Sequence, residues 1–469
     1  MTRSLERGRT DIPNGGVSYW YTGTALPVYR PSLPGSLDAD VCIVGGGFTG
    51  LWTAYYLKRE QPDLRIVILE REFAGFGASG RNGGWLSAEL AGSRPAYAKV
   101  HGRQGVVDLL AAMRAAVDEV IAVAQRESID ADIRKDGLLH VARNPAQLAR
   151  LEASLEFERY WGAGAADFRL LSQDELAERI VVNGSLGGIF SPHCARVQPA
   201  KLVQGLAGAV ERLGVPLYER TTVREISPGL ARTEHGDVRA PIILRCLEGF
   251  TASISGHQRD WLPMNSSMIV TQPLPPEVKA QIGWDKAELL GDMAHGYMYA
   301  QRTADDRIAL GGRGIPYRFG SRTDDRGATQ QWTIRALQDL LHQMFPAVRD
   351  VPTAQAWCGV LGVPRDWCAT VSLDQATGLG TAGGYVGSGL TTTNLAGRTL
   401  TDLVLRRETA LTRLPWVGHR VRPWEPEPLR WLGVRAMYTL YRAADRRESQ
   451  SNRRQSSRIA RVANLITGR

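Results

Sequence analysis

Residues 38–60 read DADVCIVGGGFTGLWTAYYLKRE and join an apolar run, a glycine cluster and a helical pattern. The run VCIV (41–44) has the length and apolar content of a buried strand, and FTGLWTAYYLKRE (48–60) has helical spacing. A second apolar run, LRIVILE (64–70), follows directly. Strand, helix and strand within about thirty residues predict a βαβ crossover, the unit of a parallel α/β sheet.

The glycines at the turn of this crossover have the GxGxxG spacing of a dinucleotide-binding loop. Gly45 permits the tight turn out of the strand, Gly47 lets the backbone approach a pyrophosphate, and Gly50 lets helix and strand pack closely. The helix N-terminus then faces the phosphates, where its amides stabilise negative charge. Glu70 stands about twenty residues past Gly50, where it can accept a hydrogen bond from a ribose hydroxyl. These residues predict a site for the ADP half of a dinucleotide.

This motif alone does not separate FAD from NAD. Arg71 could hold the 2′-phosphate of NADP, but the Glu70 carboxylate would meet that phosphate as a like charge. A second cluster, GFGASGRNGG (75–84), repeats the GxGxxG spacing. It fails as a second dinucleotide site, because no strand precedes it directly and Val100, not an acid, stands about twenty residues on. Its glycines, with Arg81 and Asn82 as donors, indicate close approach to a large flat ligand or a mobile loop.

Length and composition favour a globular protein of two domains. The chain has 469 residues, of which 43% are apolar and 22% charged. Its five cysteines form no CxxC pair and are odd in number, which favours buried thiols in a reducing compartment. No apolar leader opens the sequence, no run approaches the length of a membrane span, and no metal-ligand cluster stands out. We therefore expect a cytoplasmic protein.

The formal net charge of +9 is concentrated near the C-terminus, where eight arginines from Arg442 onward face only Asp445 and Glu448. No zinc spacing or recognition-helix pattern accompanies them, so nucleic acid is not expected as a partner. A solvated or frayed basic terminus is the simplest interpretation. A membrane-surface helix is the alternative, because an apolar stripe crosses the segment among arginines: Leu429, Leu432, Ala436, Leu440 and Ala444.

The sequence pattern of the rest of the chain changes from one segment to the next. Residues 1–37 read as an extended lead-in whose Tyr19, Trp20 and Tyr21 pack onto a neighbour. Residues 95–190 read as an inserted helical layer, and 195–252 return to helix and strand. Short alternating strands after residue 253 predict an antiparallel sheet that can wall a pocket. The segment 378–408 reads as strand, turn and helix.

Three segments in this order resemble the D-amino-acid-oxidase-like superfamily of FAD-dependent oxidoreductases, in particular its branch similar to γ-glutamylputrescine oxidase: VCIVGGGFTGLWTAYYL (41–57), ILEREFAGFGASGRNGG (68–84) and GGYVGSGLTTTNLAGRTLTDLV (383–404). The resemblance implies an α/β fold, with a Rossmann-like FAD-binding domain (38–94, 195–252 and 352–412). An intertwined α+β substrate domain (95–194 and 253–351) would use an antiparallel sheet plus helices. Residues 1–37 remain a lead-in, and 413–469 a C-terminal helix and basic tail. Both glycine clusters would then approach one extended FAD.

The resemblance also implies a set of cofactor contacts. Those at the pyrophosphate are Gly45, Gly47, Phe48, Thr49 and Gly50, and those at the adenosine are Glu70, Arg71 and Val223. The loop along the ribityl chain and flavin edge holds Gly77, Ala78, Ser79, Arg81, Asn82, Gly83 and Gly84. The turn at the pyrimidine end holds Gly387, Ser388, Gly389, Leu390 and Thr391. Gly249 ends a further strand, and Glu248 before it departs from the small residues usual in the family.

The activity that the resemblance implies is oxidation of the C–N bond of an amine or amino-acid-like substrate to an imine. The hydride would go to flavin N5, and O2 or another acceptor would reoxidise the flavin. Residues that could meet the substrate or stack at the flavin are Tyr297, Tyr299, Arg302, Arg313, Trp85 and Trp357. Ordinary sheet packing and surface ion pairs account equally well for the presence of these residue types. We expect no metal.

Three other functions compete with this one. A flavin monooxygenase shares the first motif, but the late glycine segment carries no aspartate until Asp402. An NAD(P)-dependent reductase would need a second qualifying nucleotide site. The third alternative is a flavin-fold protein with a non-catalytic binding role, and the basic tail is the feature that favours it.

Overall fold

The computed structural model describes residues 12–22, 26–312, 317–323, 326–451 and 453–460. Its first sheet has six strands in the order β19-β20-β13-β2-β3-β9, parallel except for β19 against β20. The strands are β2 (Val41–Val44), β3 (Ile66–Leu69), β9 (Leu217–Tyr218), β13 (Ile242–Arg245), β19 (Thr370–Leu373) and β20 (Leu379–Gly383). With α1 (Phe48–Glu60) between β2 and β3, the predicted βαβ crossover is confirmed.

Both faces of this sheet are covered. Ile43 of β2 packs into a core shared with the helices α1, α2 (Arg94–Arg126), α5 (Pro199–Arg212) and α8 (Gly389–Val404). Cys42 and Val44 pack into a second core, under a four-stranded sheet of β1 (Leu37–Asp38), β10 (Val223–Ser227), β11 (Leu230–Thr233) and β12 (Asp237–Arg239). A strand buried on both faces needs apolar residues throughout, which is why VCIV shows no alternation.

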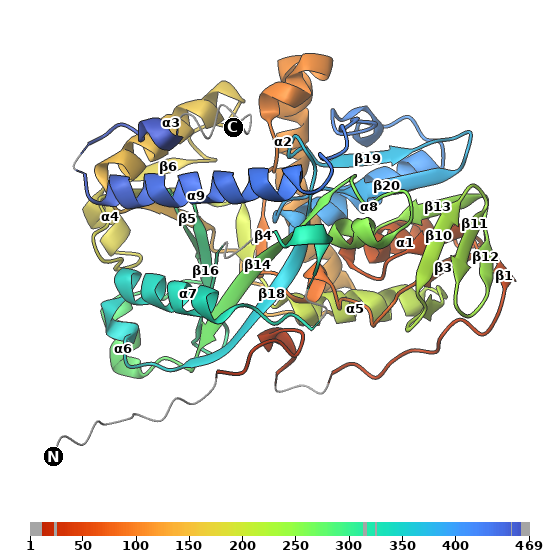
Figure 1. Cartoon of the computed structure of the whole chain (residues 1–469), viewed down its shortest axis with the longest axis horizontal. Coiled ribbons are helices and arrows are strands. Elements are labelled where there is room, and N and C mark those ends of the chain that lie inside the picture. Colours follow the sequence, from red (N-terminus) through yellow and green to blue (C-terminus); the bar gives the residue numbers. More distant parts are fainter. Residues whose placement is uncertain (1–11, 23–25, 313–316, 324–325, 452, 461–469) are drawn as a thin grey trace.

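The second sheet has eight strands in the order β18-β14-β17-β16-β15-β5-β7-β6, antiparallel except for β15 beside β5 (Figure 1). They are β5 (Leu138–Ala142), β6 (Arg169–Leu171), β7 (Gly187–Ser191), β14 (Leu262–Thr271), β15 (Leu289–Asp292), β16 (Met298–Arg302), β17 (Ile308–Gly312) and β18 (Thr353–Val363). The remaining helices are α3 (Pro145–Tyr160), α4 (Gln173–Ala177), α6 (Pro276–Ile282), α7 (Gln331–Met344) and α9 (Leu429–Ser449), and β4 (Trp85–Ser87) pairs with β8 (Cys194–Arg196). The predicted antiparallel sheet after residue 253 is confirmed.

Two segments differ from the sequence interpretation. Residues 95–190 are not a purely helical layer, because β5, β6 and β7 from this stretch join the eight-stranded sheet. These strands are short and lie between long helical runs, so their pattern is weak. The segment β18 was expected in the FAD-binding domain but pairs along its length with β14 in the second sheet. The proposed domain limits otherwise stay a prediction.

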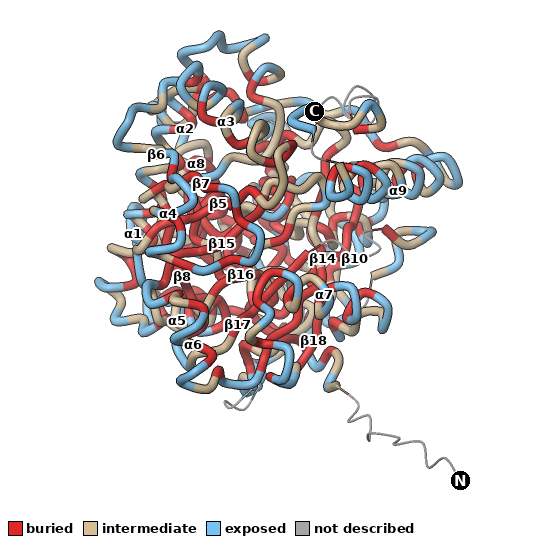
Figure 2. Tube along the Cα trace, turned by 90° about the vertical axis from the view of Figure 1, so that its left-hand side faces the viewer, coloured by how far each residue is buried: buried red, intermediate tan, exposed pale blue. Residues whose placement is uncertain are grey.

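Both ends of the described chain pack onto the molecule. Trp20 and Tyr21 are buried, as predicted for the lead-in. Helix α9 lies across the molecule and touches both α3 and α7 (Figure 1), so the prediction of a frayed terminus from Arg442 onward is wrong for 442–449. Figure 2 shows the buried residues gathered between the sheets and helices. Within the predicted apolar stripe, Ala444 is buried while Leu429 and Leu432 are 60% and 52% exposed.

Candidate functional site

A cavity of about 700 Å³ is lined by both sheets. The first sheet contributes the ends of β2 and β3, at Val44 and Leu69, and the second contributes residues of β14, β16 and β18. Ligands of parallel α/β sheets bind at the carboxyl ends of the strands, and this is the edge where the cavity opens. Its size is that of a site for a small molecule or cofactor.

The first glycine loop has the geometry that its sequence predicts. Gly45 has a φ of +114°, and a Cβ there would lie 2.5 Å from the carbonyl oxygen of Cys246, so only glycine fits. A Cβ at Gly50 would overlap the carbonyl oxygen of Gly45, because α1 packs closely on the loop. Near Gly47, by contrast, only the Ser79 side chain lies within 4 Å of an added Cβ. Gly47 therefore presents bare backbone to the cavity.

Glu70 joins this loop to the end of β3. Its carboxylate accepts hydrogen bonds from the backbone N–H of Gly46 at 2.8 Å and of Glu72 at 2.9 Å. Burial raises the pKa of Glu70, while these two amides and the charge of Arg71 oppose the shift. Glu70 and Arg71 both line the cavity, beside Val223. The acid thus stands where a ribose hydroxyl would complete its set of donors.

The second glycine loop is held rigidly. Arg81 is 2% exposed, its Nε donates to the Phe76 carbonyl at 2.8 Å, and its guanidinium lies 4.4 Å from the centre of the Phe76 ring. The Asn82 amide donates to the Ser79 carbonyl at 2.8 Å. The Ser79 hydroxyl accepts from the backbone N–H of Phe48 at 2.9 Å, which ties the two glycine loops together. These bonds favour approach to a ligand over a mobile loop.

The third glycine segment brings a helix N-terminus to the cavity. Gly387, Ser388, Gly389 and Leu390, at the start of α8, line its wall. The first amides of a helix have no intrahelical partners, so this end offers donors and a favourable dipole to an electron-rich ring edge.

Glu248 lies close to this helix end. Its carboxylate accepts from the backbone N–H of Gly384 at 3.1 Å and of Tyr385 at 3.0 Å, and its own φ is +46°. Burial raises the pKa of Glu248 to about 7, although the backbone amides oppose the shift. Because it also lines the cavity, Glu248 can exchange a proton near neutral pH beside a bound ligand.

Aromatic side chains meet at the other end of the cavity. Trp85 and Tyr299 lie edge to face with ring centres 6.1 Å apart, and His140 of β5 lies 6.4 Å from Trp85. The Tyr299 hydroxyl is 2.8 Å from the Ser266 hydroxyl, and Trp85 Nε1 donates to the Ala300 carbonyl at 3.2 Å. The pairing of Gly291 in β15 with both His140 and Tyr299 places these two rings on one face of the sheet, and Trp85 of β4 lies over Gly291. The corner suits a small apolar or cationic group.

Polar residues line the same end, named here the substrate end. Asp292 closes β15, and its Oδ1 accepts from the N–H groups of Met298 at 3.1 Å and Ala294 at 3.4 Å. Burial raises the pKa of Asp292 to about 6. Arg150 and His295 also line this end, with Tyr297 next to them in the turn after β15.

The structure brings most of the predicted site residues together. Those that line the cavity are Gly45, Gly47, Phe48, Thr49, Glu70, Arg71, Gly77, Ala78, Ser79, Arg81, Asn82, Gly83, Trp85, Val223, Tyr297, Tyr299, Gly387, Ser388, Gly389 and Leu390. Gly50, Gly84, Gly249 and Thr391 lie behind the wall. A Cβ at Gly249, for instance, would lie 2.7 Å from Val360. These four residues shape the backbone of the site rather than its surface.

Two predicted substrate residues, Arg302 and Trp357, lie away from the cavity. Arg302 faces the other side of β16, where its Nη1 pairs with Asp306 at 2.6 Å. Trp357 is fully buried, with its Nε1 donating to the Arg81 carbonyl at 2.9 Å and its ring against Trp20. It therefore supports the second glycine loop from behind instead of stacking on a ligand. Arg313 lies outside the described residues.

The predicted site residues did not include several polar residues of the substrate end, namely His140, Arg150, Asp292 and His295. They come from β5, α3, β15 and the turn that follows β15. A polar residue directly after the apolar run of β15 was the one available signal for Asp292. Within the part of the chain that the structure describes, no helix is both long and apolar enough to cross a bilayer.

The cavity wall fits FAD. Two glycine loops present bare backbone along one side, and Glu70 offers a carboxylate at the far end of the first loop. Helix N-termini of α1 and α8 reach the wall at two separate places, one suited to a pyrophosphate and one to a ring edge. A dinucleotide without a large ring system would leave the second and third glycine segments without a ligand.

Comparison with known proteins agrees with this geometry. Residues 40–403 match the family model "DAO: FAD dependent oxidoreductase". Gamma-glutamylputrescine oxidoreductase of Escherichia coli K12 is 30% identical over 412 residues, which cover 84% of this chain and 91% of that protein. A probable oxidoreductase, OrdL, of Rhizobium meliloti is 28% identical over 84% of this chain and 90% of its own.

Solved structures share the fold. Glycine oxidase from Geobacillus kaustophilus superposes with a TM-score of 0.67 at 22% identity, covering 82% of this chain and 99% of that one. L-amino acid deaminase from Proteus myxofaciens also reaches 0.67, at 17% identity, over 83% of this chain and 95% of its own. The expected family, fold class and cofactor are thereby confirmed. The chain belongs to the DAO family of FAD-dependent oxidoreductases and is an enzyme that uses FAD.

Proposed function

We propose that this enzyme oxidises the C–N bond of a small amine or amino-acid-like substrate to an imine, with O2 taking up the electrons afterwards. The observation that carries the proposal is the aromatic and polar substrate end, which continues directly from the part of the cavity that fits FAD. The names of the relatives support the substrate class, since they include a gamma-glutamylputrescine oxidoreductase, a glycine oxidase and an L-amino acid deaminase. FAD, when bound, supplies the hydride acceptor.

The protein's own residues orient the substrate and exclude water. The rings of Trp85 and Tyr299 would flank the carbon that is oxidised, and the hydrogen bond between Tyr299 and Ser266 fixes the tyrosine ring. An amine enters mostly as an ammonium ion and must lose a proton before it can give up a hydride. His140 Nε2 lies in this corner, 3.6 Å from Glu89 Oε1, and we assign it as the proton acceptor.

The test is anaerobic reduction of the purified holoenzyme. Amino acids, secondary amines and diamines are mixed singly with the protein, and the loss of visible flavin absorbance is followed. We expect reduction by at least one amine and formation of hydrogen peroxide when air is admitted. Reduction by NADPH alone would refute the proposal and favour a reductase or monooxygenase. His140→Gln should slow anaerobic flavin reduction by that amine, because the group that accepts the ammonium proton is removed.

We also place the enzyme in the cytoplasm, because all five cysteines are buried thiols without a disulfide bond, as suits a reducing compartment. Fractionation of the source cells would check this assignment, and recovery outside the cytoplasm would contradict it.

A further inference from the structure

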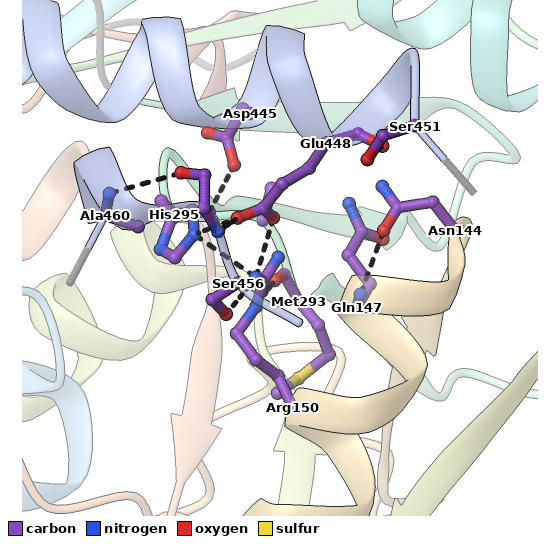
Figure 3. A network of polar contacts seen from close by, with 12 residues as sticks. Asn144, Gln147, Arg150, Met293, His295, Asp445, Glu448, Ser451, Ser456 and Ala460 are labelled. Carbon is purple, nitrogen blue, oxygen red and sulfur yellow. Dashed lines mark hydrogen bonds and ion pairs between the residues drawn. The ribbon is translucent and has the colours of Figure 1, made fainter. Parts of the chain in front are cut away.

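The C-terminal helix α9 is bonded to the wall of the substrate end (Figure 3). Glu448 of α9, which is 2% exposed, accepts hydrogen bonds from Arg150 Nη1 at 2.7 Å and from His295 Nε2 at 3.1 Å. Asp445, one helical turn earlier, accepts from the backbone N–H groups of His295 and Gly296, both at 2.8 Å. Arg150 and His295 line the cavity, whereas Glu448 stands behind them.

Glu448 is a fixed anion in this network. Burial alone would raise its pKa, but hydrogen bonds from His295, Ser457 and Arg150 hold the pKa of Glu448 at about 2. The carboxylate is therefore charged near neutral pH. The ring of Tyr441 stacks on His295, with centres 5.9 Å apart, and fixes the imidazole from its other side.

Arg150 depends on Glu448 for its charge partner. Its Nε donates to the Met293 carbonyl at 2.8 Å, and its Nη1 donates also to the Ser456 hydroxyl at 3.0 Å. Among the described residues, Glu448 is the one carboxylate in an ion pair with Arg150. Nη2 is buried and has no hydrogen-bond partner in the described chain. A guanidinium so placed loses its position when its anion is removed, since a buried unpaired charge is costly.

We infer that Glu448 is a positioning residue for substrate binding, because it holds the Arg150 guanidinium and the His295 imidazole in the wall of the substrate end. The C-terminal segment, which lies beyond the family match at residues 40–403, is thereby a part of the substrate site. This inference rests on the proposed function, because its expected consequence is a change in affinity for the amine substrate. Glu448 does not touch the part of the cavity that fits FAD, so flavin content stays unchanged when it is altered.

The experiment compares Glu448→Gln with Glu158→Gln in the full-length holoenzyme. Glu158 pairs with Arg94 through two hydrogen bonds, at 2.7 Å and 2.9 Å, and neither residue of this pair lines the cavity. The probe is the amine that reduces the wild-type flavin fastest, used anaerobically at a series of concentrations. We expect E448Q to raise the apparent Kd about tenfold, a coupling of ordinary size within one network, and to leave the limiting rate within about twofold. E158Q should change neither value.

Amide hydrogen exchange of residues 293–297 in the resting holoenzyme provides a readout that needs no substrate. We expect faster exchange at His295 and Gly296 in E448Q, because their donors to Asp445 depend on the seating of α9. An unchanged apparent Kd, or an equal rise in E158Q, would overturn the inference. If no amine reduces the wild-type flavin, the proposed function fails. The positioning role is tested separately: it is overturned if residues 293–297 exchange their amide hydrogens at the same rate in E448Q as in the wild type.

Discussion

Replacing Gly50 by alanine separates the packing role of the first glycine loop from its ligand-binding role. An added Cβ would overlap the carbonyl oxygen of Gly45 and lie 3.0 Å from the Ile43 Cγ2 methyl. The oxygen belongs to the backbone of the loop itself, so no side-chain rotation relieves the contact. Helix α1 must therefore move away from β2.

The expected cost follows from this backbone contact. We expect Gly50→Ala to lower the free energy of unfolding of the flavin-free protein by about 3 kcal/mol, the upper part of the usual range for overpacking. In a chain of this length such a loss lowers Tm by roughly 3 °C. Gly47→Ala is the matched control, because its Cβ would meet only the Ser79 side chain, with the hydroxyl at 3.0 Å. It should keep the Tm of the flavin-free protein but weaken FAD binding at least about tenfold, since the methyl enters the cavity.

The assay measures thermal unfolding of both variants after flavin removal, and then their FAD affinity by titration with fluorescence. We expect opposite patterns: lost stability for Gly50→Ala, and lost FAD affinity with unchanged stability for Gly47→Ala. Equal Tm values for Gly50→Ala and wild type would refute it. An equal loss of Tm in the two variants would also refute it. Gly47 and Gly50 would then both serve packing, and no separate ligand-binding role would remain.

Three other side chains of the site give separate outcomes. Glu70→Ala removes the acceptor of the Gly46 and Glu72 amides, and we expect it to weaken FAD binding by about 2 kcal/mol, or roughly thirtyfold, in the same titration. Glu248 has its pKa raised from 4.5 to about 7, so folding favours its protonated form and its contribution to stability falls as pH rises between these values. Denaturant unfolding of flavin-free Glu248→Gln should lack this slope, and parallel pH profiles would contradict the assignment. Arg302→Ala should lose less than about 1 kcal/mol of stability and leave the apparent Kd for the amine unchanged, because its pair with Asp306 lies outside the cavity; a raised Kd would return the residue to the site.

The FAD half of the cavity was readable from the sequence because backbone atoms build it. A glycine marks a place where backbone must turn sharply or approach a ligand, and Gly45 and Gly47 do this at positions fixed by the strand before them and the helix after them. Both the turn and the approach are local properties of a few consecutive residues. A parallel crossover consists of a strand, a helix and a strand that follow one another in the sequence, so it can be recognised without long-range information. The α/β fold class was therefore predictable from the same motif.

The substrate end was not readable because side chains from distant segments build it. His140, Arg150 and Asp292 meet only after β5 has paired with β15, a contact between residues about 150 positions apart. Tyr297, Tyr299 and Arg302 were equal candidates from the sequence, but only the two tyrosines line the cavity, because Arg302 lies on the other face of β16. One strand's pattern shows that two faces exist, and only the neighbouring strands decide which face meets a cavity.

The C-terminal helix shows the same limit in its charges. Counted along the sequence, Asp445 and Glu448 are a minority in a basic run, which normally indicates a solvated face. Counted around a helix, they share one stripe with Tyr441 while the arginines between them point outward, and the structure buries this stripe against Arg150 and His295. Two acids three residues apart inside a basic run therefore favour a helix that docks by its acidic stripe onto basic side chains. The acidic stripe predicts that the surface onto which the helix docks is basic, whereas the positive net charge of the segment predicts an acidic surface.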